Sequence, residues 1–275
     1  MSVFRPSELR QFLDSLGVRA RKSLSQNFLI DGNILRKIVS AAGVTSDDLV
    51  IEIGPGPGAL TEFLLQTGAR VVAIEKDRVF ANALQRLDHG NGQLRIFEAD
   101  ALDFDLSPIL GLSSSIKVVA NLPYQLTSPL LGKLVPLGPS VKSLTLMVQK
   151  EVAERITARA GTEDYSSLSI FVELYAEAQL MFTVEPTCFY PRPKVRSAVV
   201  HLDLHRPPAD LDAASFIRFI RTAFGKRRKT LRSSLRSLFP REAISAALQA
   251  QRLGEDARPE TLSLDQFIHL FRSLI

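Results

Sequence analysis

A glycine-rich turn at residues 54–58 follows directly after an apolar, β-branched segment at residues 49–53. Turns of this kind let the backbone approach a ligand at the carboxyl edge of a sheet, where open α/β domains bind their ligands. The turn reads Gly-Pro-Gly-Pro-Gly, so its third glycine comes one position earlier than in the fingerprint of dinucleotide-binding domains. The turn therefore favours an α/β fold with a ligand site beside its first strand.

Strand and helix patterns alternate after this turn. We expect strands at residues 49–53, 70–75, 94–98, 116–121 and 143–148, and helices at 59–67, 77–87 and 128–134. Such alternation, with β-branched strands, is typical of a parallel sheet that helices cover on both faces. The sequence therefore predicts a Rossmann-like, doubly wound, mostly parallel α/β domain. Two later apolar segments, at 179–184 and 197–204, are expected to extend the edge of its sheet.

The pattern changes near residue 206, where Pro207 and Pro208 form the best linker in the chain. Beyond them the apolar periodicity is helical throughout. We therefore expect a domain over residues 1–206 with an N-terminal helical extension at 6–17, and a small all-helical domain over residues 207–275. A chain of 275 residues with 45% hydrophobic content is long enough for one large and one small domain.

Positive charge is concentrated in the last quarter of the chain. From Arg206 onward there are 13 Lys and Arg residues against 7 Asp and Glu, whereas residues 1–205 carry 21 against 22. Residues 221–236 contain seven basic residues and no acidic ones, a pattern that suits a polyanion, with a solvated helix face as the alternative. We expect phosphate contacts from Arg21, Lys22, Lys226, Arg227, Arg228, Lys229, Arg232 and Arg236.

Composition argues against several other classes of protein. No run approaches the roughly 18 apolar residues of a membrane span, and Arg5, Glu8 and Arg10 interrupt the stretch where a signal peptide would be apolar. Cys188 is the only cysteine, which excludes an internal disulfide and a cysteine-rich zinc site. We expect a cytoplasmic monomer that requires neither a membrane nor a metal.

Acidic residues surround the glycine-rich turn in sequence order. Glu52 precedes it, and Glu75 ends the second strand, 21 positions after Gly54, where an acid binds both hydroxyls of a cofactor ribose. Asp100 follows the third strand, where a carboxylate could accept an N–H of an adenine. Glu52 suits the cationic sulfonium and amino-acid tail of S-adenosylmethionine better than a pyrophosphate. Taken alone, Glu75 or Asp100 could equally be a helix cap.

The segment Asn121-Leu-Pro-Tyr124 follows the fourth strand. Asn121 Oδ1 and the Leu122 carbonyl can each accept one N–H of an amine on a base, and Tyr124 can cover the ring. Asn and Pro are also ordinary turn residues, so the segment alone is ambiguous. In combination with the turn and the acids, it predicts methyl transfer to an exocyclic amine.

Longer motifs are spread over nearly the whole chain. They are Ser-Gln-Asn-Phe-Leu at 25–29, the glycine-rich motif at 52–61, Glu-Ala-Asp-Ala at 98–101, Ala-Asn-Leu-Pro-Tyr at 120–124, Met-Val-Gln-Lys-Glu-Val at 147–152, Phe-Tyr-Pro-Arg-Pro-Lys-Val at 189–195, Ser-Ala-Val-Val at 197–200 and Phe-Gly-Lys-Arg-Arg-Lys-Thr-Leu-Arg at 224–232. Together they closely resemble the bacterial ribosomal RNA adenine N6-dimethyltransferases, specifically the small-subunit dimethyladenosine transferases linked to kasugamycin sensitivity. The first and last motifs are distinctive for this family.

The resemblance implies a reaction and a substrate. It implies dimethylation, with S-adenosylmethionine, of N6 of two adjacent adenosines in a hairpin near the 3′ end of small-subunit (16S) RNA, in an immature 30S particle. It implies S-adenosylmethionine contacts at Asn27, Leu29, Gly54, Glu75, Asp100 and Asn121. It also implies that Asn121, Leu122 and Tyr124 face the target adenine, and that Phe189 stacks on its other side.

Other functions stay open from the sequence. The sister enzyme that dimethylates large-subunit RNA shares the catalytic motifs, and the segment at 224–232 favours the small-subunit form. The chain could also act chiefly as a ribosome-assembly factor. A DNA adenine methyltransferase and a nicotinamide dehydrogenase are weaker alternatives.

Overall fold

The computed structural model describes residues 3–18, 26–226 and 229–275. Contacts divide the chain into two compact units. The first unit comprises Met1–Ala153 and Ala178–His205, and the second comprises Glu154–Glu177 and Arg206–Ile275. The second unit therefore starts again close to the expected linker, but it also includes a segment that the sequence-based division placed in the first domain.

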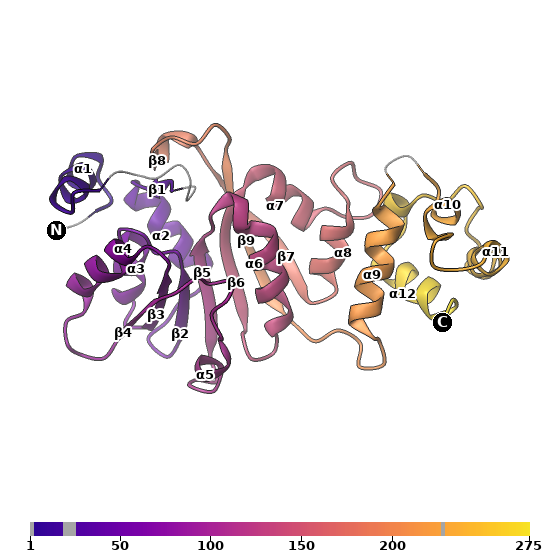
Figure 1. Ribbon diagram of the computed structural model, residues 1–275, viewed down its shortest axis with the longest axis horizontal. Helices are drawn as coiled ribbons and strands as arrows, with labels where there is room; N and C mark the ends of the chain where they lie inside the picture. The colour runs from indigo at the N-terminus through magenta and orange to yellow at the C-terminus, as the bar shows by residue number, and fades with distance from the viewer. Residues whose placement is uncertain (1–2, 19–25, 227–228) are drawn as a thin grey trace. The chain divides into compact units, whose positions relative to one another are not determined.

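A seven-stranded sheet forms the centre of the first unit, in the order β4-β3-β2-β5-β6-β9-β7 (Figure 1). Strands β2 to β6 run parallel to one another, and β9 is antiparallel to β6. The strands of the sheet are β2 (Leu49–Ile53), β3 (Arg70–Glu75), β4 (Leu94–Glu98), β5 (Ile116–Asn121), β6 (Ser143–Gln149), β7 (Ala176–Val184) and β9 (Ser197–Leu204). The predicted doubly wound, mostly parallel sheet is confirmed.

Short helices connect these strands and precede them. They are α1 (Pro6–Ser15), α2 (Gly32–Ala41), α3 (Ala59–Leu65), α4 (Arg78–Leu84), α5 (Ser107–Leu110), α6 (Thr127–Leu134) and α7 (Lys150–Thr157), with 3₁₀ turns η2 (Gln85–Leu87), η3 (Tyr124–Leu126), η4 (Val135–Leu137) and η5 (Pro186–Cys188). Helices α2 and α4 begin where Asp31 and Asp77 accept hydrogen bonds from backbone N–H groups of the first turn.

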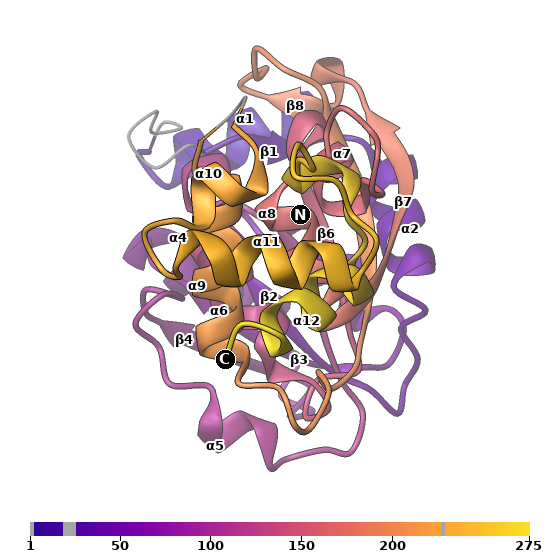
Figure 2. The ribbon, with the colours of Figure 1, turned by 90° about the vertical axis from the view of Figure 1, so that its right-hand side faces the viewer.

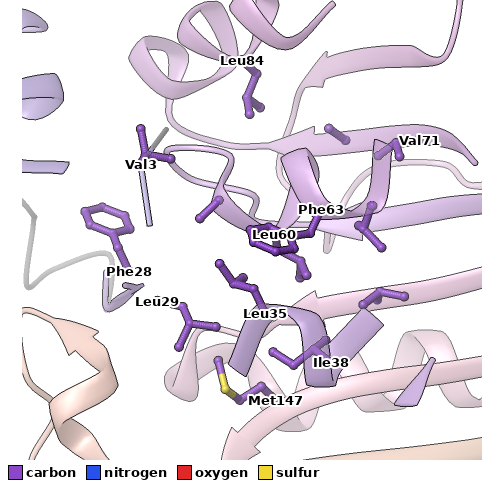
Figure 3. Close-up of a cluster of buried hydrophobic side chains, with 14 of the residues drawn as sticks. Val3, Phe28, Leu29, Leu35, Ile38, Leu60, Phe63, Val71, Leu84 and Met147 are labelled. Carbon is purple, nitrogen blue, oxygen red and sulfur yellow. The ribbon is translucent and has the colours of Figure 1, made fainter. Parts of the chain in front are cut away.

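Apolar side chains cover both faces of the sheet. One face packs Val71 and Met147 against Leu35 and Ile38 of α2 and Phe63 of α3 (Figure 3). Residues that alternate with these along the strands, such as Val72, Val118 and Leu144, point to the other face and are also buried. Burial on both faces explains why apolar residues occupy most positions of the central strands.

The strand order reverses direction at β2, whose neighbours β3 and β5 lie on either side of it. At such a switch point the loops after two adjacent strands diverge and leave a crevice at the carboxyl edge of the sheet. The turn after β2 therefore lies at the place where an open α/β sheet binds its ligand.

A two-residue ribbon lies outside the main sheet. Strand β1 (Phe28–Leu29) pairs antiparallel with β8 (Phe189–Tyr190), so that Leu29 is opposite Phe189. The ribbon continues through a hydrogen bond from Ile30 N to the Cys188 carbonyl, at 2.8 Å. Segments near the two ends of the first unit's sequence are thereby joined beside the sheet.

The second unit is built from helices. They are α8 (Ser167–Glu173), α9 (Ala213–Phe224), α10 (Leu231–Leu235), α11 (Arg241–Ala250) and α12 (Leu264–Arg272), with the 3₁₀ turn η6 (Pro259–Thr261), and all five helices are labelled in Figure 2. Phe219 of α9 packs against Phe267 and Phe271 of α12. In the described part of the chain, no helix is long and apolar enough to cross a membrane.

The segment 154–177 belongs to the second unit for a physical reason. Gly161 donates a hydrogen bond to the Glu260 carbonyl at 2.8 Å, and the Tyr165 ring lies 6.1 Å from the Phe224 ring. These contacts link residues that are far apart in sequence, so no local pattern predicted them.

Candidate active site

A cavity of about 250 Å³ lies at the carboxyl edge of the sheet in the first unit. Its walls come from the segments that follow β2, β3, β4 and β5, and from the segment around β1. All six residues that the resemblance assigned to the cofactor line this one cavity: Asn27, Leu29, Gly54, Glu75, Asp100 and Asn121. Leu122 and Tyr124 line it as well.

The glycine-rich turn forms one wall of the cavity. Gly54 has a φ of +64° and Gly58 a φ of +87°, conformations that residues with a Cβ rarely adopt. A Cβ at Gly58 would lie 2.7 Å from Leu84 Cδ2, whereas nothing lies within 4 Å of a Cβ built at Gly54. Gly58 thus allows close packing of the turn on the fold, and Gly54 leaves its backbone open to a ligand.

Glu75 connects this turn to the end of β3. Its Oε2 accepts a hydrogen bond from Gly56 N and its Oε1 accepts one from Asp77 N, each at 2.8 Å. Burial raises the pKa of the Glu75 carboxyl, and the two backbone donors partly offset that shift. A carboxylate oxygen can accept more than one hydrogen bond. Glu75 can therefore hold the turn and, at the same time, bind the hydroxyl groups of a ligand.

Asp100 lies after β4, on the neighbouring wall. Its Oδ2 is 2.6 Å from Lys76 Nζ, and its Oδ1 accepts a hydrogen bond from Leu102 N at 3.0 Å. The hydrogen bond from Lys76 is the main reason why the pKa of Asp100 lies below its usual value. Lys76 also lines the cavity, a role that only its position directly after Glu75 could have indicated.

Glu52 is a buried acid that lines the cavity. Its side chain is 1% exposed, and neither carboxyl oxygen has a hydrogen-bond partner among the described residues. Burial raises the pKa of Glu52 to about 8, and the negative charge of Glu75 adds to that rise, while the nearby Thr61 hydroxyl opposes it. A buried carboxyl group without a partner is costly, so this one is suited to receive a polar or cationic group.

Asn121 is the last residue of β5, and a hydrogen bond from its amide nitrogen fixes the orientation of its side chain. Asn121 Nδ2 donates a hydrogen bond to the Asn27 carbonyl oxygen, at 3.1 Å. With the nitrogen turned to Asn27, the amide oxygen is turned away from that carbonyl and is available as an acceptor. This bond joins two predicted site residues that are 94 positions apart in sequence.

Hydrogen bonds with β6 and β9 hold the residues that follow Asn121. Leu122 N donates to the Met147 carbonyl at 3.1 Å, and the Tyr124 hydroxyl lies 2.7 Å from Ser197 Oγ. Burial raises the pKa of Tyr124, and the Ser197 contact partly offsets the rise. Ser197 is fully buried at the start of β9, and it fixes the Tyr124 ring, which the sequence reasoning did not foresee.

Phe189 is placed differently from the other predicted site residues. It is 1% exposed in β8, packs in the apolar cluster and does not line the cavity. Its neighbour across the ribbon, Leu29, does line the cavity. A base can reach the Phe189 ring only if the β1–β8 ribbon moves, so the predicted stacking stays a prediction.

The predicted phosphate contacts lie partly outside the described residues. Arg21, Lys22, Arg227 and Arg228 fall there. Lys226, Lys229 and Arg236 are exposed in the second unit, whereas Arg232 is partly buried and forms an ion pair with Glu255. Within the described ranges, no group of three or more His, Cys, Asp or Glu side chains could hold a metal ion.

Comparisons with known proteins identify the family of this chain. A family described as "Ribosomal RNA adenine dimethylase" matches residues 17–275. "Ribosomal RNA small subunit methyltransferase A" of Protochlamydia amoebophila is 51% identical, over 100% of this chain and 98% of that protein.

Two solved structures share the fold. A dimethyladenosine transferase from Plasmodium falciparum has a TM-score of 0.76 and 29% identity, and the match covers 88% of this chain and 95% of that one. The 23S rRNA methyltransferase ErmE has a TM-score of 0.70 and 25% identity, with coverage of 90% and 99%. From these matches, the chain belongs to the ribosomal RNA adenine dimethylase family.

Proposed function

We propose that this chain dimethylates N6 of two adjacent adenosines in the 3′-terminal hairpin of small-subunit ribosomal RNA. Family membership gives the reaction, which is S-adenosylmethionine-dependent dimethylation of adenine in ribosomal RNA. The relative at 51% identity supports the small subunit. The observation that carries the proposal is the position of Asn121, whose fixed amide borders the same cavity as Gly54, Glu75 and Asp100.

The cavity fits S-adenosylmethionine. When bound, this cofactor supplies a methyl group attached to a positively charged sulfur. We assign its ribose to Glu75 and its adenine to Asp100, with Asn27, Leu29 and Gly54 completing the contacts. Glu52, the buried acid without a hydrogen-bond partner, can lose its proton and balance the positive charge when the cationic end of the cofactor binds. The negative charge of a pyrophosphate would instead be repelled by these carboxylates.

Asn121 and Leu122 are proposed to hold the target amine. The Asn121 amide oxygen and the Leu122 carbonyl each accept one N–H of the adenine N6 group, which directs its lone pair toward the cavity. Neither group is a strong base, and none is needed, because the amine becomes acidic as it gains a methyl group and its proton passes to water. Catalysis at this site is therefore mainly positioning.

Tyr124 is proposed to cover the face of the adenine, with its ring fixed through Ser197. The target base must leave its stack, which costs a few kcal/mol, and aromatic stacking returns roughly 1–3 kcal/mol per base. Phe189 would add a second aromatic surface once the β1–β8 ribbon opens. Movement of this ribbon would also reach Asn27 and Leu29, because Leu29 is paired with Phe189.

We further propose that the substrate is an immature 30S particle and that the protein acts as a cytoplasmic monomer. The exposed lysines of the second unit, Lys226 and Lys229, support a surface for RNA phosphates. Arg21, Lys22, Arg227 and Arg228 lie outside the described residues, and their phosphate contacts rest on the resemblance and on charge alone.

The test is transfer of an isotope-labelled methyl group from S-adenosylmethionine to RNA in purified immature small subunits, followed by mass spectrometry. We expect N6,N6-dimethyladenosine at two adjacent positions of the 3′-terminal hairpin. Large-subunit RNA is assayed in parallel, and labelling confined to it would replace the proposal with the large-subunit activity. A chain that binds the particles without labelling any adenine would instead be an assembly factor.

A further inference from the structure

Lys133 lies on α6, and its ammonium group is enclosed by backbone carbonyls of the segment that follows β4. Lys133 Nζ is 2.8 Å from the Ala101 carbonyl oxygen, 2.8 Å from that of Leu102 and 2.6 Å from that of Phe104. An ammonium group has three N–H donors and no acceptor. All three donors are therefore used on one short segment, 29 to 32 positions away in sequence.

The same segment, residues 100–104, carries Asp100 and is folded tightly around it. Asp103 N and Phe104 N both donate to the Asp100 carbonyl, at 3.1 and 2.9 Å, and Leu102 N donates to Asp100 Oδ1. This folding turns three other carbonyls toward Lys133, where their partial negative charges converge. Without a cation, these carbonyls would lose their common partner, and the segment would lose the contact that holds it in this form.

Helix α6, which carries Lys133, begins close to the residues proposed to bind the target amine. Helix α6 begins at Thr127, three residues after Tyr124, and Leu130, Leu131 and Leu134 anchor it in the core. Leu130 lines the cavity, and so do Asp100 and Ala101. Lys133 thus connects two walls of the cavity, although it does not line the cavity itself.

We propose that Lys133 is a positioning residue, which holds the segment 100–104 so that Asp100 can bind the cofactor adenine. The inference rests on the proposed role of Asp100. It goes beyond that role because Lys133 touches neither cofactor nor RNA and acts through backbone carbonyls. Removal of the ammonium should therefore weaken cofactor binding by way of Asp100, and not through general loss of stability.

Lys117 offers a matched control. It is also partly buried, and its Nζ donates to the Gly43 carbonyl at 2.6 Å and to Asp48 Oδ2 at 2.9 Å. It extends from β5, the strand that ends at Asn121, but these contacts lie at the amino edge of the sheet, away from the cavity. Lys117→Met should therefore lower thermal stability without a specific effect on cofactor affinity.

The experiment is a double-mutant cycle in the full-length protein, with the dissociation constant for S-adenosylhomocysteine measured by calorimetry. We expect Lys133→Met and Asp100→Asn each to weaken binding about tenfold, because each removes contacts of a charged group. The double variant should be little weaker than Asp100→Asn alone, since Lys133 acts through Asp100. Lys117→Met should change affinity less than about twofold.

A second measurement locates the effect. Hydrogen exchange at the amides of Leu102, Asp103 and Phe104 should accelerate about tenfold or more in Lys133→Met and remain unchanged in Lys117→Met. Lys133→Arg keeps the charge, but its planar fork does not match three convergent carbonyls, so an intermediate affinity is expected. If Lys133→Met does not fold, Lys133→Arg replaces it in the cycle.

The outcomes separate this inference from the proposed function. Independent, multiplicative losses in the double variant, or unchanged affinity in Lys133→Met, would overturn the role of Lys133. Unchanged affinity in Asp100→Asn would overturn the adenine contact and with it the basis of the inference. Failure of the unaltered protein to bind S-adenosylhomocysteine would instead remove the proposed function itself.

Discussion

The cavity of the first unit and the basic surface of the second, defined by Lys226, Lys229, Arg232 and Arg236, use charge in opposite ways. In the cavity, Glu52 and Glu75 are buried, and Glu75 is fixed by two backbone donors. On the basic surface, Lys226, Lys229 and Arg236 are exposed, and Arg232 is paired with Glu255. The cavity should therefore depend on exact geometry and pH, and the basic surface on salt.

Asn121→Ala tests the geometric side of this contrast most strongly. We expect the turnover number to fall at least about 100-fold, as when one fixed polar group is removed from a reacting centre. The affinity for RNA should change far less, because Asn121 acts on one amine. Asn82→Ala, at an exposed position of α4 that does not line the cavity, should keep nearly full activity. Equal losses of turnover and RNA affinity would remove the division of roles between the two regions.

Glu75→Gln tests whether a buried acid binds the cofactor. We expect affinity for S-adenosylhomocysteine, measured by calorimetry, to fall roughly 10- to 100-fold, because a charged acceptor of hydroxyl groups is lost. Glu98 is paired with Glu75 in strand register but is exposed, so Glu98→Gln is the matched control. Similar affinities in the two variants would show that the ribose lies elsewhere.

Glu52→Gln tests whether Glu52 makes the free energy of unfolding depend on pH. The folded-state pKa of about 8 lies above the ordinary value of 4.5, so the protonated acid favours the fold. Its contribution is fully present below pH 4.5 and is lost as the pH rises to about 8, by roughly 2 kcal/mol or more. Chemical denaturation of the ligand-free proteins at pH 5 and pH 9 should show this loss only in the unaltered protein. Parallel pH profiles of the two proteins would mean that the pKa of Glu52 is the same in the folded and unfolded states, and that burial does not raise it.

Lys226→Glu with Lys229→Glu tests the electrostatic side. Each lost phosphate contact should reduce the slope of log affinity against log salt by about 0.7–0.9. Affinity for S-adenosylhomocysteine should remain unchanged. Lys142→Glu alters an exposed lysine beside the amino end of β6 and should leave the RNA salt slope intact. An unchanged slope in the double variant would exclude these lysines from the RNA interface.

Much of the fold was predictable because its signals are local. The strands at 49–53, 70–75, 94–98, 116–121 and 197–204 have the predicted bounds, since each is a short segment rich in apolar residues. The convergence of the proposed cofactor residues on one cavity was predictable for a related reason. Gly54, Glu75, Asp100 and Asn121 follow parallel strands or end them, and parallel strands end at the same edge of the sheet.

Other features depend on contacts between distant residues and left no local pattern. The β1–β8 ribbon pairs two residues with two others that follow about 160 positions later, and it buries Phe189 instead of presenting it to the cavity. The contacts of Ser197 with Tyr124 and of Lys133 with the segment 100–104 are equally remote. A serine or a lysine alone does not indicate such a partner.

A crystal structure of the protein with S-adenosylhomocysteine would test the assignment of the cavity. We expect the ribose hydroxyls on Glu75, the adenine amine on Asp100 and the sulfur on the side of the cavity that Asn121 borders. If the nucleoside bound away from these three residues, both the cofactor site and the role of Asn121 would have to be abandoned.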